Sequence, residues 1–210
     1  MIKDSLAALA GALLIAHATA ALAASATDLS VKGAITPSAC TPSLSNNGFV
    51  DYGKISMHDL NPTGATELPK TLFKLAVNCE APSLFGLASE DNRDSVEGPN
   101  ASFVLGRISA TNWIGTYFLS MDNILTDDPA AYPIYSMDNG STWLFNPDKH
   151  VPANTMIAFG NQSSGIRAPV PLAGVSMDLV VEPFIFPKNQ IPVDETIPLD
   201  GSATFELRYL

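Results

Sequence analysis

The sequence ends in IPLDGSATFELRYL (residues 197–210), and this stretch decides the fold. Apolar or small residues occupy every second position, namely Ile197, Leu199, Gly201, Ala203, Phe205, Leu207 and Tyr209. Thr204, Glu206 and Arg208 lie between them. Because successive side chains of a β-strand point to opposite faces, the alternation predicts a strand with one buried face.

The same period of two occurs near the other end of the chain. The apolar or small residues there are Leu29, Val31, Gly33 and Ile35, with Ser30, Lys32 and Ala34 between them. Further strands are predicted at residues 72–77, 84–88, 102–108, 113–120, 156–159 and 175–186, with turn signals such as Asn46-Asn47-Gly48 and Asp138-Asn139-Gly140 between them. After residue 23 no segment longer than about ten residues has a clean helical period. We therefore expect an all-β chain folded as one immunoglobulin-like β-sandwich, with a loop-rich middle at residues 122–151.

The first 23 residues have the features of a secretory signal peptide. Lys3 gives a basic start, residues 6–16 are apolar, and the small residues Ala21 and Ala23 form a small-x-small cleavage site. The apolar run is short for a bilayer span, although an N-terminal anchor helix is the alternative. We expect a signal peptide at residues 1–23 and one domain at residues 24–210.

The chain contains two cysteines, Cys40 and Cys79. In an exported protein two cysteines usually pair with each other, so we expect a disulfide between them. No CxxC spacing is present, and His58 and His150 are the histidines that follow the signal peptide. The sequence therefore predicts neither a metal site nor a cofactor.

The charge and motif content argue against nucleic-acid binding and catalysis. The chain has 11 basic against 21 acidic residues, for a net charge of −10, and a strongly acidic surface repels nucleic acid and anionic lipid. The sequence lacks a GxSxG elbow, an HExxH motif and a glycine-rich phosphate loop. We expect a protein that is not an enzyme, and a secreted hydrolase is the weakest alternative.

Two groups of residues suggest ligand binding. The run at residues 89–98 is rich in oxygen ligands, but Arg93 occupies a position where a calcium loop needs a ligand, which favours a solvated turn. Aromatic residues that could stack on a sugar are Trp113, Trp143, Tyr117, Tyr132, Tyr135 and Phe145. Aromatic residues at strand spacing usually belong to a core, which is the simpler interpretation.

Three segments give the chain a resemblance to the subunits of chaperone–usher fimbriae, the pilins of Gram-negative bacteria. They are LSVKGAITPSAC (residues 29–40), LPKTLFKLAVNC (residues 68–79) and the ending GSATFELRYL with its penultimate Tyr209. More narrowly, these features resemble a pilin-related group of exported proteins, domain-of-unknown-function family 1120. The resemblance covers about a third of the mature chain, at both ends.

The resemblance implies a sandwich that lacks its last strand and a groove along its C-terminal strand. A periplasmic chaperone would fill this groove until the N-terminal strand of the next subunit replaces it. The donor strand, within residues 24–36, would present Leu29, Val31, Gly33 and Ile35, and the acceptor strand would present Ala203, Phe205, Leu207 and Tyr209. The alternative is that residues 29–35 form an ordinary first strand of a complete sandwich.

These observations lead to two hypotheses for the function. The first is a non-enzymatic structural subunit of a surface fimbria or pilus, which passes through the periplasm and is assembled with a chaperone, an usher and other subunits. The second is a binding module, either a glycan-binding fimbrial adhesin active in cell adhesion or a self-complemented periplasmic binding protein. A structural subunit should polymerise, whereas a self-complemented binder should be a soluble monomer.

Overall fold

The computed structural model of the chain describes residues 30, 32, 39–95, 101–109, 112–163, 165–192 and 196–210. Residues 36–210 form one compact unit, separate from the first 35 residues. The predicted signal peptide (residues 1–23) and the predicted donor residues Leu29, Val31, Gly33 and Ile35 lie outside the described residues.

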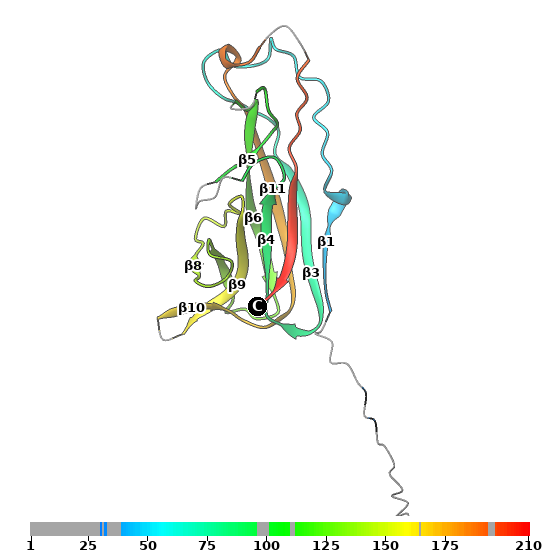
Figure 1. The fold of residues 1–210 in the computed structure, drawn as a ribbon, viewed down its shortest axis with the longest axis vertical. Coiled ribbons are helices and arrows are strands. Elements are labelled where there is room, and N and C mark those ends of the chain that lie inside the picture. Colours follow the sequence, from blue (N-terminus) through cyan, green and yellow to red (C-terminus); the bar gives the residue numbers. More distant parts are fainter. Residues whose placement is uncertain are drawn as a thin grey trace, which may run out of the picture. The chain divides into compact units, whose positions relative to one another are not determined.

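The described chain forms two antiparallel sheets that face each other (Figure 1). The first sheet has the order β1 (Cys40–Leu44), β3 (Thr71–Ser83), β11 (Leu172–Ile185), β6 (Gly115–Thr126) and β5 (Phe103–Val104), and β2 (Thr66–Glu67) also pairs with β11. The second has the order β12 (Ala203–Tyr209), β4 (Phe85–Asp91), β9 (Thr155–Ser163), β7 (Tyr132–Ser136) and β8 (Leu144–Phe145), and β10 (Ile166–Pro169) also pairs with β9. The described chain also contains two short 3-10 helices, η1 (Ser45–Gly48) and η2 (Lys188–Gln190). The predicted all-β sandwich is confirmed.

The core lies between the sheets and follows from the alternation within each strand. In β3 the side chains of Phe73, Leu75 and Val77 are buried, whereas those of Leu72 and Lys74 are exposed. Burying one apolar side chain of this size contributes about 1.5–3 kcal/mol, which makes the alternation the main determinant of the strand's orientation. Among the described residues, no helix is long and apolar enough to cross a membrane.

Several predicted strands have different ends in the structure. The strand predicted at residues 102–108 is reduced to Phe103–Val104, because Gly106 has a positive φ of 110° and turns the chain. The strand predicted at residues 113–120 begins at Gly115 and continues to Thr126. The middle predicted to be loop-rich, residues 122–151, therefore contains the end of β6 as well as β7 and β8.

The alternating residues 197–201 are not part of a strand, although the pattern predicted one. Ile197 and Leu199 still pack against the core. The backbone N–H of Asp200 donates to the carbonyl of Leu105, so this segment is bound to a loop of the other sheet and has no strand partner. An alternating pattern reports which side chains are buried, but a strand also requires a neighbouring backbone.

A turn between β7 and β8 is held by one carboxylate. Asp138 accepts hydrogen bonds from the backbone N–H of Thr142 at 2.8 Å, from the Thr142 hydroxyl at 2.6 Å and from the Ser136 hydroxyl at 2.7 Å. These bonds, chiefly those from Thr142, lower the pKa of Asp138 to about 2. Asn139 and Gly140 have positive φ angles, as the predicted turn at these residues requires.

Candidate functional site

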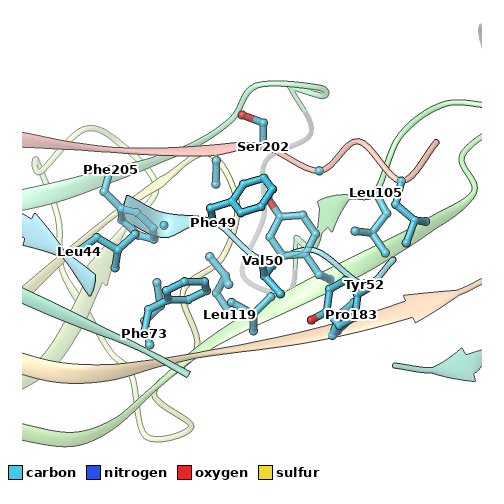
Figure 2. Close-up of a pocket in the computed structure, with 17 residues that line it drawn as sticks. Leu44, Phe49, Val50, Tyr52, Phe73, Leu105, Leu119, Pro183, Ser202 and Phe205 are labelled. Carbon is cyan, nitrogen blue, oxygen red and sulfur yellow. The ribbon is translucent and has the colours of Figure 1, made fainter. Parts of the chain in front are cut away.

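An apolar groove lies between the last strand and the segment that follows β1 (Figure 2). Its volume is about 350 Å³. The residues that line it come from both sheets and are Leu44, Gly48, Phe49, Val50, Tyr52, Phe73, Leu105, Tyr117, Leu119, Leu179, Val181, Pro183, Leu199, Gly201, Ser202, Ala203 and Phe205. Phe49 is 72% exposed at the groove although it is a large apolar residue. The hydrophobic core is therefore open to solvent along this side.

The β12 wall of the groove presents apolar side chains. Ala203, Phe205 and Leu207 are partly buried and pack against the core, whereas Thr204 and Glu206 are exposed. This is the inward face that the alternating sequence predicted. The three inward residues remain only partly buried, because no strand of the described chain covers them on the groove side.

Among the described residues, no strand pairs with the backbone of β12 on its groove side. β12 pairs with β4 and ends the strand order of its sheet. The N–H of Asn92 donates to the carbonyl of Ser202, and the N–H of Leu210 donates to the carbonyl of Leu84. These two bonds show which residues of β12 exchange hydrogen bonds with β4. The even-numbered residues of β12 bond to β4, and the odd-numbered residues direct their N–H and C=O groups away from it. The predicted acceptor residues Ala203, Phe205 and Leu207 thus present unpaired backbone groups at the groove.

The facing edge of β1 offers few hydrogen-bond donors. The N–H of Glu80 donates to the carbonyl of Ala39, so Cys40, Pro42 and Leu44 are the β1 residues whose backbone is directed away from β3. Pro42 has no N–H, and the N–H of Cys40 already donates to the Tyr209 hydroxyl at 2.8 Å. A strand entering the groove would therefore pair mainly with β12.

The predicted disulfide between Cys40 and Cys79 is present and joins the edge strand β1 to β3. The two cysteines are directly opposite in the strand register. Because the Tyr209 hydroxyl accepts the bond from Cys40, this end of β12 is tied to β1, and the two walls meet there. The sequence predicted Tyr209 to be an inward acceptor residue, but its side chain is 47% exposed, and the pattern did not indicate this contact across 169 positions. The disulfide is evidence of folding in an oxidising compartment outside the cytoplasm.

The other end of the β12 wall is held by an ion pair. The guanidinium of Arg93 binds the carboxylate of Asp200 through two hydrogen bonds of 2.6 and 2.9 Å. The Arg93 side chain holds the pKa of Asp200 below its usual range. At the next residue, Gly201, a Cβ atom would lie 2.9 Å from Cε1 of Tyr117, so a larger residue would displace that ring. The groove wall is therefore in close contact with the floor at this glycine.

The oxygen-rich run beginning at Ser89 uses its side chains within the fold. The carboxylate of Asp91 accepts bonds from the backbone N–H groups of Arg93 and Val104, each at 2.8 Å. The buried Ser89 hydroxyl donates to the carbonyl of Pro152 at 2.7 Å. Within the described ranges, no three metal-ligating side chains come together. His58 and His150 are both exposed.

The aromatic residues considered as a sugar platform lie in separate places. Tyr117 stacks on Phe103 in the first sheet, with ring centroids 5.1 Å apart. Tyr132 and Phe145 form an edge-to-face pair in the second sheet. Trp113 stands against the guanidinium of Arg107, 4.7 Å from the ring centroid. The structure therefore divides this set among different surfaces.

Part of this chain, including one wall of the groove, is similar to a described protein family. Residues 29–118 match the profile of the family described as protein of unknown function (DUF1120). The resemblance to this family, proposed from the sequence, is thereby confirmed. The matched residues include β1, both cysteines and β3, which form one wall of the groove and its support.

Two proteins of Escherichia coli K12 are similar over nearly the whole chain. Protein GltF is 28% identical over 244 residues, which cover 95% of this chain and 96% of GltF. The uncharacterized protein YhcF is 24% identical over 226 residues, covering 92% of this chain and 94% of YhcF. The similarity therefore extends from the N-terminal region to the strands that form the groove.

Proposed function

We propose that this chain is a non-enzymatic structural subunit of a surface fimbria, joined to neighbouring subunits by an extended strand inserted along β12. The observation that supports this most directly is the unpaired backbone of Ala203, Phe205 and Leu207 beside an apolar groove. An edge of this kind favours β-augmentation, in which the added strand gains main-chain hydrogen bonds and places alternate side chains in the groove.

The groove has the chemistry to stabilise such a strand. Its lining is mostly aliphatic and aromatic. If three alternate aliphatic side chains of the inserted strand are buried there, they contribute roughly 5–9 kcal/mol before the entropy of ordering the strand is subtracted. Residues Leu29, Val31, Gly33 and Ile35 have the alternation that such a strand needs.

In this proposal the inserted strand comes from a second copy of the chain. Five backbone steps separate Ile35 from Cys40 and span at most about 18 Å, whereas the six steps from Ala203 to Tyr209 extend about 20 Å. Cys40 is bonded to Tyr209 at the far end of β12. For its own Ile35 to lie beside Ala203 in an antiparallel pair, residues 35–40 would have to be almost fully extended, whereas a strand from a second copy has no such restraint.

In this proposal the exposed edge of β12 must be covered before the subunits assemble. An exposed apolar strand edge pairs with other chains and aggregates unless something covers it. We propose that a periplasmic chaperone covers β12 during export and that an usher then brings the next subunit. The proposed location is the periplasm in transit and then the cell surface.

The test compares two variants that place a leucine on opposite faces of the donor segment. Gly33→Leu should abolish the ladder of non-covalent polymers on unboiled gels while leaving the melting temperature of the mature subunit unchanged. Ser30→Leu, on the polar face of the alternation, should retain the ladder. If the mature wild-type chain is a stable monomer and Gly33→Leu lowers its melting temperature, the subunit proposal is wrong, and the self-complemented binding protein takes its place.

A further inference from the structure

The groove contains a tyrosine hydroxyl that has no hydrogen-bond partner in the described part of the chain and is not fully enclosed. Tyr117, on β6, is only 7% exposed and lines the groove. Its hydroxyl makes no hydrogen bond to any described residue, and it is not among the fully enclosed polar atoms. The hydroxyl of Tyr52, which also lines the groove, is satisfied by the carbonyl of Pro69 at 3.1 Å and the hydroxyl of Thr71 at 3.2 Å.

The Tyr117 ring is held in a fixed place. It stacks on Phe103 with an interplanar angle of 21°. Gly201 packs against its Cε1 atom so closely that a Cβ atom would lie only 2.9 Å away. Burial, reinforced by the negative charge of Asp91, raises the pKa of Tyr117 well above its ordinary value. The group therefore stays a neutral hydroxyl and a hydrogen-bond donor throughout the physiological pH range.

An inserted strand would separate this hydroxyl from water. A buried polar group without a partner is costly, so a strand that covers Tyr117 must also supply an acceptor. The side chains that line the groove around it are mostly apolar. An extended peptide in contrast brings a carbonyl oxygen at every residue, whatever its sequence.

We propose that Tyr117 is a positioning residue of the groove, whose hydroxyl donates a hydrogen bond to a backbone carbonyl of the inserted strand. This inference rests on the proposed function and adds to it a polar anchor in an otherwise apolar site. One hydrogen bond at a fixed place would also discriminate between strand registers, because a shift of one residue exchanges the carbonyls that point toward β12 with those that point away from it.

The test measures binding of a fluorescent peptide with the sequence of residues 26–38 to the mature chain carrying Gly33→Leu, which removes the competing donor. Tyr117→Phe keeps the stacked ring and deletes the oxygen. The peptide should bind about three- to tenfold more weakly to this variant, the effect of one net hydrogen bond. The melting temperature without peptide should be unchanged or higher, because the deleted hydroxyl bonds to no described residue of the subunit.

Tyr132→Phe is the matched control. It removes a tyrosine hydroxyl on β7, outside the groove lining, so it should leave peptide affinity within about twofold. Peptide binding should also shift the near-ultraviolet absorbance of tyrosine in the parent chain, and this shift should be missing in Tyr117→Phe. Equal affinity and an equal spectral shift in the parent and Tyr117→Phe chains would overturn the role of Tyr117 alone. If the parent chain binds no peptide, the strand-acceptor function itself is wrong, and this inference with it.

Discussion

Replacing both cysteines by alanine should cost the protein a large part of its stability. The disulfide joins Cys40 to Cys79, a sequence separation of 39. On the chain-entropy estimate, closing a loop of this length in the unfolded state contributes about 4 kcal/mol, against a typical total of about 5–15 kcal/mol for a domain. The double variant should therefore unfold at a much lower urea concentration.

The assay is equilibrium urea unfolding followed by tryptophan fluorescence. The oxidised wild-type chain, the same chain with a reductant, and the double alanine variant are compared. The reduced chain and the variant should unfold together, because both lack the same covalent restraint. Thiol titration of the denatured, unreduced protein should detect no free sulfhydryl, since Cys40 and Cys79 are the chain's two cysteines. If the free energy of unfolding falls by less than about 1 kcal/mol, the loop-entropy reasoning is wrong for this fold.

Loss of the disulfide should also affect strand acceptance. β1 is an edge strand with one strand neighbour, β3, and its wall of the groove depends on staying there. The double variant should bind the peptide of residues 26–38 more weakly than the oxidised chain even at temperatures where it remains folded. Equal affinity would show that the β1 wall contributes little, and that β12 with the groove floor accounts for binding.

Three further predictions concern single sites. Phe205→Glu places a charge on the inward face of β12 and should lower stability by about 2–4 kcal/mol and abolish polymers, whereas Thr204→Glu on the exposed face should change neither. Replacing both His58 and His150 by alanine should change the free energy of unfolding by no more than about 0.5 kcal/mol per site, because both side chains are exposed. A larger change, or loss of any assayed turnover, would point to an active site. The lowered pKa of Asp138 stabilises the fold above about pH 4, the pKa in the unfolded chain, and this contribution is lost as the pH falls toward about 2. The melting temperature of Asp138→Asn should therefore fall less between pH 4 and pH 2 than that of the wild-type chain. Identical pH profiles would show that the hydrogen bonds to Asp138 do not stabilise the fold.

The local pattern of the sequence was sufficient for the strands that have one buried face. In β12, the alternation of Ala203, Phe205 and Leu207 predicted which side chains point inward, because the period of a strand is set by its own backbone geometry. Strands of two to five residues are too short for a clear pattern, so β1, β2, β7, β8 and β10 were missed. The pairing of Cys40 with Cys79 followed from their number and from the predicted export of the chain.

The tertiary structure alone decided what surrounds those strands. Residues 197–201 continue the alternation but form no strand, since the N–H of Asp200 bonds to a loop of the opposite sheet. Likewise, the absence of a described partner for the Tyr117 hydroxyl and the hydrogen bond between Cys40 and Tyr209 depend on residues far apart in the chain. A side chain's inward direction is a local property of the strand, whereas a free edge, an open groove and an unsatisfied donor are defined by which other segments are, or are not, beside it.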